Sequence, residues 1–184
     1  MTSVGATFHW PVRVYWEDTD AGGIVFYANY LKFFERSRTE WLRSLGVEQQ
    51  RLRESTGGMF VVVETSIRYH RPARLDDELI VTASLIEKGR ASLIIGQQVL
   101  LKSEQIKSSD GPVHEGKSPN EKERSEGPPQ ASSAPSGGSA LRAAKSVGAT
   151  LICEGRIKIG WVDGLTMRPA RIPDSIVSRL RTPT

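Results

Sequence analysis

The stretch VRVYWEDTDAGGIVFYANYLKFFERSRTEWL (residues 12–42) changes character twice along its length. Its start alternates apolar and polar residues with a period of two, which predicts a strand over residues 10–16, with Pro11 near the strand's beginning. Its end repeats apolar residues at helical spacing, which predicts a helix over residues 27–45. Between the two lies a segment rich in carboxylates and glycine. A strand, an acidic glycine loop and a long helix therefore set the fold class.

Both predicted elements have one apolar face. The strand places Val12, Val14 and Trp16 on the same side of the chain. The helix carries an apolar stripe, with charged residues largely on the opposite side, and Gly46 follows as a stop signal. The stripe consists of Tyr30, Leu31, Phe34, Trp41, Leu42 and Leu45.

The remaining ordered sequence predicts more strands than helices. Four segments alternate or carry apolar residues at strand spacing, and we expect them to be strands: residues 59–71, 77–88, 91–101 and 150–162. Lys88, Gly89 and Arg90 form a hairpin turn signal. Short helical segments are expected at residues 48–55 and 173–180. The order strand, long helix, then four strands connected as a meander predicts an α+β fold in which an antiparallel sheet wraps one helix.

Residues 103–148 differ in composition from the rest of the chain. They hold half of the ten prolines, no aromatic residue and only four large aliphatic residues. Such a segment buries too little apolar area to offset its ordering entropy, so we expect a disordered insert. Because loop-closure entropy grows slowly with length, it fits between the last two strands. We expect residues 1–184 to form a single domain that this insert interrupts.

Composition excludes several classes of protein. The chain has 184 residues, 38% hydrophobic and 25% charged, as in one soluble globular domain. Its formal charge of +4 suits an anionic partner but does not indicate nucleic acid. Cys153 is the only cysteine, so no intramolecular disulfide is possible. We find neither a signal peptide nor an apolar run long enough to form a transmembrane segment, and we expect a cytoplasmic protein.

The acidic loop does not match a metal site. Read as an EF-hand that starts at Asp18, it has Gly22 and Asn29 where oxygen ligands are required. Read as a magnesium-dependent phosphatase motif, it lacks the expected threonine. The three histidines are scattered along the sequence. We therefore predict no metal and no organic cofactor.

An acyl-transfer site is a second interpretation of the loop. A helix N-terminus presents unpaired backbone N–H groups that stabilise a developing oxyanion. Gly22 and Gly23 let a ligand approach the backbone closely. A carboxylate on the other side of the same carbonyl can attack it or activate a water molecule. Glu17, Asp18 and Asp20 are the candidates for this role.

The stretch at residues 12–42, with YHRPARLDDEL (residues 69–79) and MRPARIPDSIV (residues 167–177), resembles the YbgC-type acyl-CoA thioesterases of the 4-hydroxybenzoyl-CoA thioesterase group. The resemblance covers the chain outside residues 103–148. It implies the hotdog fold, in which two sheets join in a homodimer and often pair further to a homotetramer.

The resemblance also implies roles for individual residues. The family's catalytic carboxylate falls on Asp20, and its oxyanion donor falls on the backbone around Tyr27. Many members carry His where this chain has Tyr27, so the side-chain role of that histidine is not transferred. Basic residues after the third strand contact the coenzyme A phosphates, and Lys88 and Arg90 occupy that turn.

We therefore expect a thioesterase that hydrolyses acyl-CoA, or an acyl carrier protein thioester, with Asp20 as nucleophile or general base. Two alternatives are non-catalytic proteins that would use the same substrate cleft without hydrolysing the thioester. One is an acyl-CoA-binding module that senses its ligand, and the other is a scaffold module that docks a partner through residues 103–148.

Overall fold

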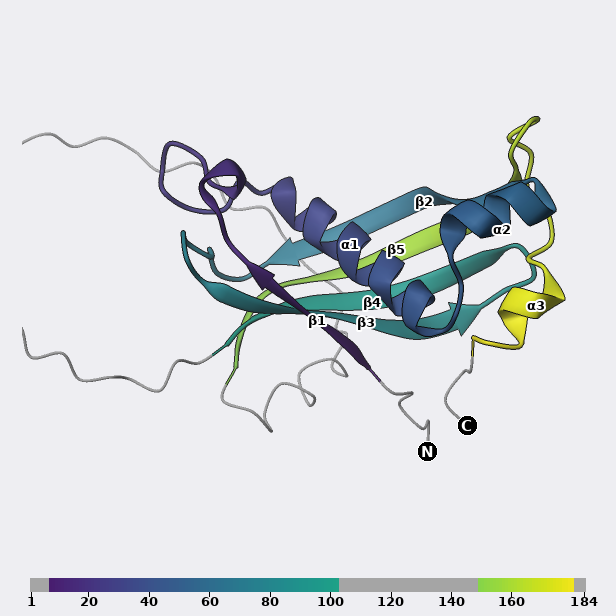
Figure 1. The fold of residues 1–184 in the computed structure, drawn as a ribbon. Coiled ribbons are helices and arrows are strands. Elements are labelled where there is room, and N and C mark those ends of the chain that lie inside the picture. Colours follow the sequence, from purple (N-terminus) through teal and green to yellow (C-terminus); the bar gives the residue numbers. More distant parts are fainter. Residues whose placement is uncertain (1–6, 103–148, 181–184) are drawn as a thin grey trace, which may run out of the picture.

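In the computed structural model, which describes residues 7–102 and 149–180, five antiparallel strands form one sheet (Figure 1). The predicted α+β class is confirmed. The strands are β1 (Phe8–Arg13), β2 (Gly58–Tyr69), β3 (Glu78–Lys88), β4 (Ser92–Leu101) and β5 (Thr150–Asp163). The helices are the 3₁₀ turn η1 (Trp16–Asp18), α1 (Asn29–Ser44), α2 (Gln49–Thr56) and α3 (Asp174–Val177).

The order of the strands corrects the predicted meander. Strands β3, β4 and β5 do follow one another across the sheet, but the full order is β1-β3-β4-β5-β2. Figure 1 shows α1 crossing one face of the sheet and α2 leading the chain back to β2. The two helices thus carry the chain from one edge to the other, and β2 pairs with β5 instead of β3.

The first strand is shorter than its sequence pattern suggests. It ends at Arg13, and Trp16 lies in η1 with 78% of its surface exposed, so Trp16 does not share the buried face of Val14. The carboxylate of Asp18 accepts the backbone N–H of Tyr15 and turns the chain there. Pro11 lies inside β1 and not at its beginning. An edge strand tolerates this because one of its sides needs no ladder donor.

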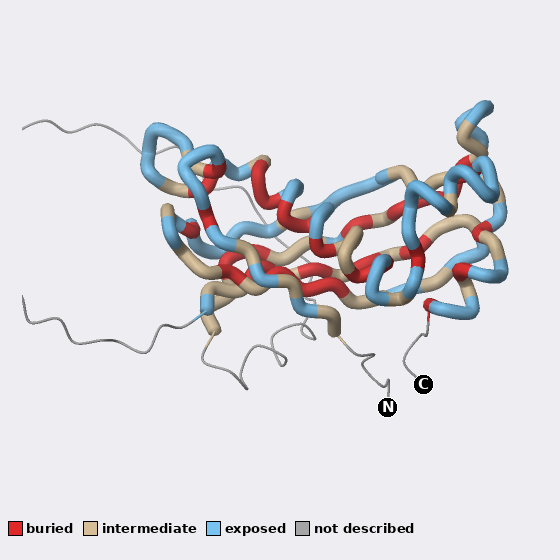
Figure 2. The backbone as a smooth tube through the Cα atoms, in the orientation of Figure 1, coloured by how far each residue is buried: buried red, intermediate tan, exposed pale blue. Residues whose placement is uncertain are grey.

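Helix α1 packs on the sheet through large aromatic side chains. Phe33, Phe34 and Trp41 are buried, whereas Leu31, which the sequence places on the apolar stripe, is 42% exposed. The ring of Phe34 lies over Gly155 of β5, where an added Cβ would meet the ring at 2.7 Å. Glycine at this position lets the helix approach the sheet closely. Figure 2 shows the buried residues concentrated where α1 faces the strands.

A buried polar network adds a second connection between α1 and the sheet. Gln97 of β4 is 1% exposed, and its amide donates to the carbonyls of Phe34 (3.0 Å) and Thr82 (3.3 Å). Its side-chain oxygen accepts a hydrogen bond of 2.7 Å from Arg38, whose pKa burial lowers. Because each buried polar group has a partner, the network fixes the helix position without an unpaired buried donor.

Cys153 is a buried member of the core on β5. Burial raises the pKa of its thiol to about 12, so the reactive thiolate is not formed at neutral pH. Cys153 thus serves as a small hydrophobic core residue.

The two strands on either side of residues 103–148 pair with each other. Leu101, the last residue of β4, pairs with Thr150, the first residue of β5. The predicted disordered insert, residues 103–148, lies outside the described residues.

Candidate active site

The acidic loop forms a small hairpin between η1 and α1. Thr19 pairs with Val25 in antiparallel fashion, and the N–H of Asp20 donates to the carbonyl of Ile24 at 2.9 Å. At the tip, the N–H of Gly23 donates to the carbonyl of Asp20 at 3.0 Å, and Gly23 has a φ of +70°, a region that favours glycine. Residues 19–25, hereafter the Asp20 hairpin, therefore hold Asp20 in a defined position.

The carboxylate of Asp20 is exposed and has a local hydrogen bond. One of its oxygens accepts the N–H of Gly22 at 2.8 Å. An added Cβ at Gly22 would lie 3.1 Å from that oxygen, so a larger residue would press on the carboxylate. Gly22 thus both orients Asp20 and leaves room for it.

Asp18 has the opposite environment. It is 3% exposed, and its carboxylate accepts the N–H of Tyr15 at 3.0 Å. Its carbonyl accepts the N–H of Phe26 at 2.9 Å and the side-chain amide of Asn29 at 3.0 Å. Asp18 therefore joins the hairpin to the start of α1, whereas the side chain of Glu17 is exposed.

The segment before β3 holds the Asp20 hairpin from the other side. The N–H of Val25 donates to the carbonyl of Ala73 at 2.9 Å, and Ile24 pairs with Arg74. The N–H of Ala73 donates to the hydroxyl of Tyr30 at 3.0 Å. Burial raises the pKa of Tyr30 to about 12, so the phenol stays neutral.

The backbone amides differ from the sequence-based expectation. The N–H groups of Gly22 and Gly23 are not open at the helix N-terminus, since both donate within the hairpin and α1 begins only at Asn29. Both glycines remain exposed to an approaching ligand. Within residues 7–102 and 149–180, the N–H groups of Tyr27 and Ala28 donate to no acceptor. These two amides precede α1 and are therefore candidates for the oxyanion donors that the sequence led us to expect around Tyr27.

Tyr27 contacts its neighbours through its backbone carbonyl, while its side chain is exposed. Its side chain is 63% exposed, and its carbonyl accepts a hydrogen bond of 3.0 Å from the hydroxyl of Tyr69 on β2. The sequence pattern does not reveal this contact, because the two residues belong to different elements.

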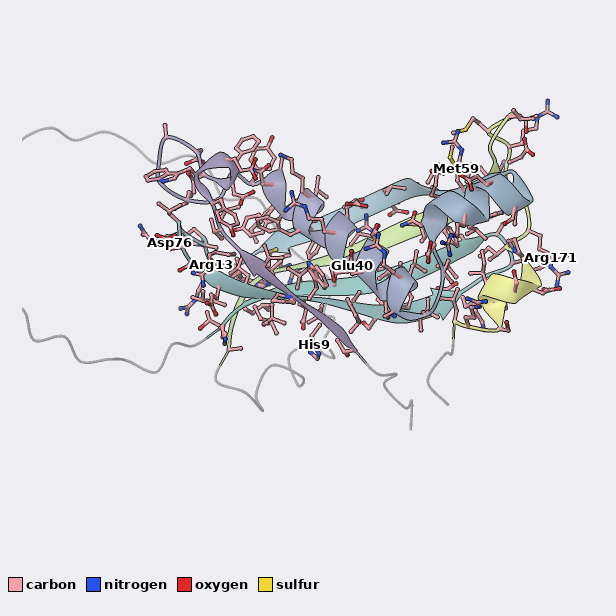
Figure 3. All side chains as sticks on the ribbon, in the orientation of Figure 1. His9, Arg13, Glu40, Met59, Asp76 and Arg171 are labelled. Atoms are coloured by element: carbon pink, nitrogen blue, oxygen red, sulfur yellow. The ribbon has the colours of Figure 1, made fainter. Side chains whose placement is uncertain are left out.

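Lys88 and Arg90 lie far from Asp20 in the same chain. They occupy the β3–β4 turn, whereas the Asp20 hairpin contacts the segment before β3, so a strand of roughly 35 Å separates them. Figure 3 shows this separation: Arg13 and Asp76 lie at the hairpin end, and Arg171 lies at the opposite end. The ammonium group of Lys88 donates to the carbonyl of Leu180 at 3.2 Å, whereas Arg90 is exposed.

The part of the chain that the structure describes holds no group of three or more His, Cys, Asp or Glu residues placed to bind a metal ion. The Nε2 atom of His70 lies 3.2 Å from the Oε1 atom of Glu154. No helix among the described residues is long and apolar enough to cross a membrane.

Comparisons with known proteins agree on one class. Residues 22–106 match the model of the thioesterase superfamily. The acyl-CoA thioesterase YbgC of Haemophilus influenzae is 48% identical over 93 residues, which are 50% of this chain and 68% of that protein. The acyl-CoA thioester hydrolase YbgC of Escherichia coli O157:H7 is 45% identical over 93 residues, which are 50% of this chain and 69% of that protein.

A solved structure gives the same fold. A mutant 4-hydroxybenzoyl-CoA thioesterase in complex with 4-hydroxybenzoyl-CoA superimposes with a TM-score of 0.68 and 13% identity. The match covers 95% of this chain and 99% of that one. The predicted hotdog arrangement, a sheet that wraps one long helix, is confirmed.

Proposed function

The chain belongs to the YbgC group of acyl-CoA thioesterases, within the thioesterase superfamily, and we propose that Asp20 is the carboxylate that performs its reaction. The enzyme hydrolyses an acyl-CoA thioester to a free acid and a thiol. The observation that carries the assignment is the contrast between two acidic residues of one loop. Asp18 is enclosed and committed to backbone hydrogen bonds, whereas Asp20 is exposed in the hairpin that precedes the amides of Tyr27 and Ala28.

The reaction needs two groups on opposite sides of the thioester carbonyl. Asp20 attacks the carbonyl carbon, the carbon–sulfur bond breaks, and the thiolate leaves and takes a proton from water. Water then hydrolyses the acyl-aspartate and restores the carboxylate. In the general-base variant, Asp20 instead removes a proton from the attacking water. In both routes the N–H groups of Tyr27 and Ala28 donate hydrogen bonds to the carbonyl oxygen and stabilise the negative charge that develops on it.

We propose a homodimer built on the edge strand β2. Among the described residues β2 pairs only with β5, and Val62 and Val63 of this strand are exposed. A long unpaired edge is a ready site for strand pairing with a second copy. Antiparallel pairing of β2 with itself would bring the β3–β4 turn of one copy toward the Asp20 hairpin of the other. A homotetramer would add a second pairing of such dimers.

This dimer would explain how residues that lie far apart in one chain could serve the same site. Lys88 and Arg90 of one chain would bind the coenzyme A phosphates while Asp20 of the other chain attacks the thioester. An acyl carrier protein thioester would present the same reacting bond and remains our second proposed substrate. We also propose a cytoplasmic location, since the single cysteine is buried and needs no oxidising compartment.

Arg90→Ala should raise KM roughly tenfold and leave kcat nearly unchanged, because it removes one charge-assisted hydrogen bond to phosphate. Arg90 is preferable to Lys88 for this test, since Lys88 also contacts the carbonyl of Leu180. Arg36→Ala, an exposed cation on α1, is the matched control and should leave KM unchanged. The measurement is steady-state hydrolysis of one acyl-CoA at several ionic strengths.

A mixed dimer tests the shared site. Differently tagged Asp20→Asn and Arg90→Ala chains are co-expressed, and the mixed species is purified. If the site combines two chains, one of the two sites is intact, and kcat/KM returns to about half of the wild-type value. Activity no higher than the mean of the two parents would show that the turn does not serve the partner's site.

We propose that residues 103–148 interrupt a single domain and are not needed for its folding. Leu101 pairs with Thr150, and the N–H of Lys102 donates to the carbonyl of Glu78 at 2.9 Å, so the described flanks are joined. Replacing residues 103–148 with a short glycine-containing turn should leave the melting temperature unchanged or slightly raised, since a shorter loop costs less to close. Thermal unfolding checks this, and an insoluble or unfolded variant would contradict it.

A further inference from the structure

The hydroxyl of Tyr69 reaches from the sheet to the residue before the open amides. It donates a hydrogen bond of 3.0 Å to the carbonyl of Tyr27, although the two residues lie 42 positions apart in the sequence. Tyr69 is the last residue of β2 and pairs with Cys153 of β5. Its ring also packs against the ring of Tyr30, with 5.7 Å between the ring centroids. The phenol is thus held by both the sheet and α1.

The carbonyl that accepts this hydrogen bond belongs to the same peptide group as one of the two open N–H groups. The carbonyl of Tyr27 and the N–H of Ala28 share one planar trans unit and point in opposite directions. Fixing the oxygen therefore fixes the direction of the N–H. Within the described residues that N–H has no acceptor of its own. A hydrogen bond to the carbonyl also polarises the amide, which strengthens its N–H as a donor.

We propose that Tyr69 is a positioning residue for thioester hydrolysis: its hydroxyl holds the Tyr27–Ala28 peptide plane so that the N–H of Ala28 points at the developing oxyanion. The inference rests on the proposed function, because it assumes that these amides receive the oxyanion. It assigns Tyr69 no contact with the substrate.

The surroundings of this hydrogen bond separate positioning from stability. Tyr69 and Tyr27 are both exposed, so water can replace the phenol at the carbonyl when the hydroxyl is removed. Water satisfies the carbonyl but does not fix its direction, so the fold should tolerate the loss better than the reaction does. The phenol of Tyr69 is protonated and able to donate at neutral pH, and partial burial of this residue raises its pKa further above the usual range.

Tyr69→Phe tests the inference with a change of one oxygen atom. Loss of a complete oxyanion donor costs roughly 100-fold or more in kcat, and a donor that is retained but poorly aimed should lose roughly tenfold. KM should stay within about twofold, because the N–H of Ala28 contacts the negatively charged oxygen only in the transition state. The melting temperature should be unchanged. Tyr15→Phe, which removes another exposed phenol hydroxyl, in the segment between β1 and η1, is the matched control and should keep wild-type kcat.

Three outcomes are distinguishable when Asp20→Asn is measured on the same acyl-CoA. Wild-type kcat in Tyr69→Phe, with kcat lost in Asp20→Asn, overturns the positioning role and leaves the proposed function intact. A fall in melting temperature that accompanies the loss of kcat in Tyr69→Phe assigns Tyr69 a structural role and also overturns the inference. Normal turnover in Asp20→Asn removes the proposed function, whatever Tyr69→Phe does.

Discussion

Asp20→Asn is expected to lower kcat for acyl-CoA hydrolysis by roughly 100-fold or more, the scale for losing a positioned nucleophile or base. The asparagine side chain keeps an oxygen that can accept the N–H of Gly22, so the hairpin should retain its shape. What the variant loses is the negative charge that attacks the thioester or removes a proton from water. Stability should therefore change little while turnover falls.

Asp18→Asn is the matched control for that loss. It removes the same charge two residues away, and its amide oxygen can still accept the N–H of Tyr15. Because Asp18 is buried and its groups face the backbone, its effect on kcat should be small beside that of Asp20→Asn. Steady-state kinetics and thermal unfolding of both variants check this. Equal losses of turnover would mean that the fold, and not a catalytic charge, explains the effect.

Phe34→Ala is expected to lower the free energy of unfolding by about 3–5 kcal/mol, the usual cost of removing a buried aromatic ring. Phe34 is fully buried, and its ring fills the space above Gly155. Truncation leaves a cavity that neighbouring side chains cannot fill without moving α1. The measurement is urea unfolding at fixed protein concentration, since association of the chains would also affect stability.

Leu31→Ala is the control for Phe34→Ala, because the sequence places both residues on the same apolar stripe. Leu31 is substantially exposed, so its truncation should change the free energy of unfolding by roughly 0.5 kcal/mol or less. Similar losses in the two variants would contradict the orientation of α1 described here.

Local pattern predicted most of the individual elements. Alternation and turn residues identified the β3–β4 hairpin, and Gly46, whose φ is +74°, marked the end of α1. These features depend on residues close together in the sequence. The pattern failed at Trp16, where the alternation continues but a hydrogen bond from the N–H of Tyr15 to the carboxylate of Asp18 turns the backbone.

Features that depend on distant residues could not be read in the same way. The partner of β2 is decided by where α1 and α2 carry the chain, and alternation alone does not record that path. Within the candidate site, the resemblance pointed to Asp20 and Tyr27, but the sequence did not show that the amides of Gly22 and Gly23 are occupied. The contact between Tyr69 and Tyr27 joins two elements and has no local signal.

The most direct test of the central claim is a single-turnover experiment with Asp20→Asn in excess over one acyl-CoA. Binding is measured by titration, and thiol release is followed from the bound complex. The account predicts that the variant binds the acyl-CoA about as tightly as the wild-type enzyme does, while thiol release slows by roughly 100-fold or more. Thiol release at a near wild-type rate from a well-folded variant would contradict it, and would leave Asp20 outside the chemistry.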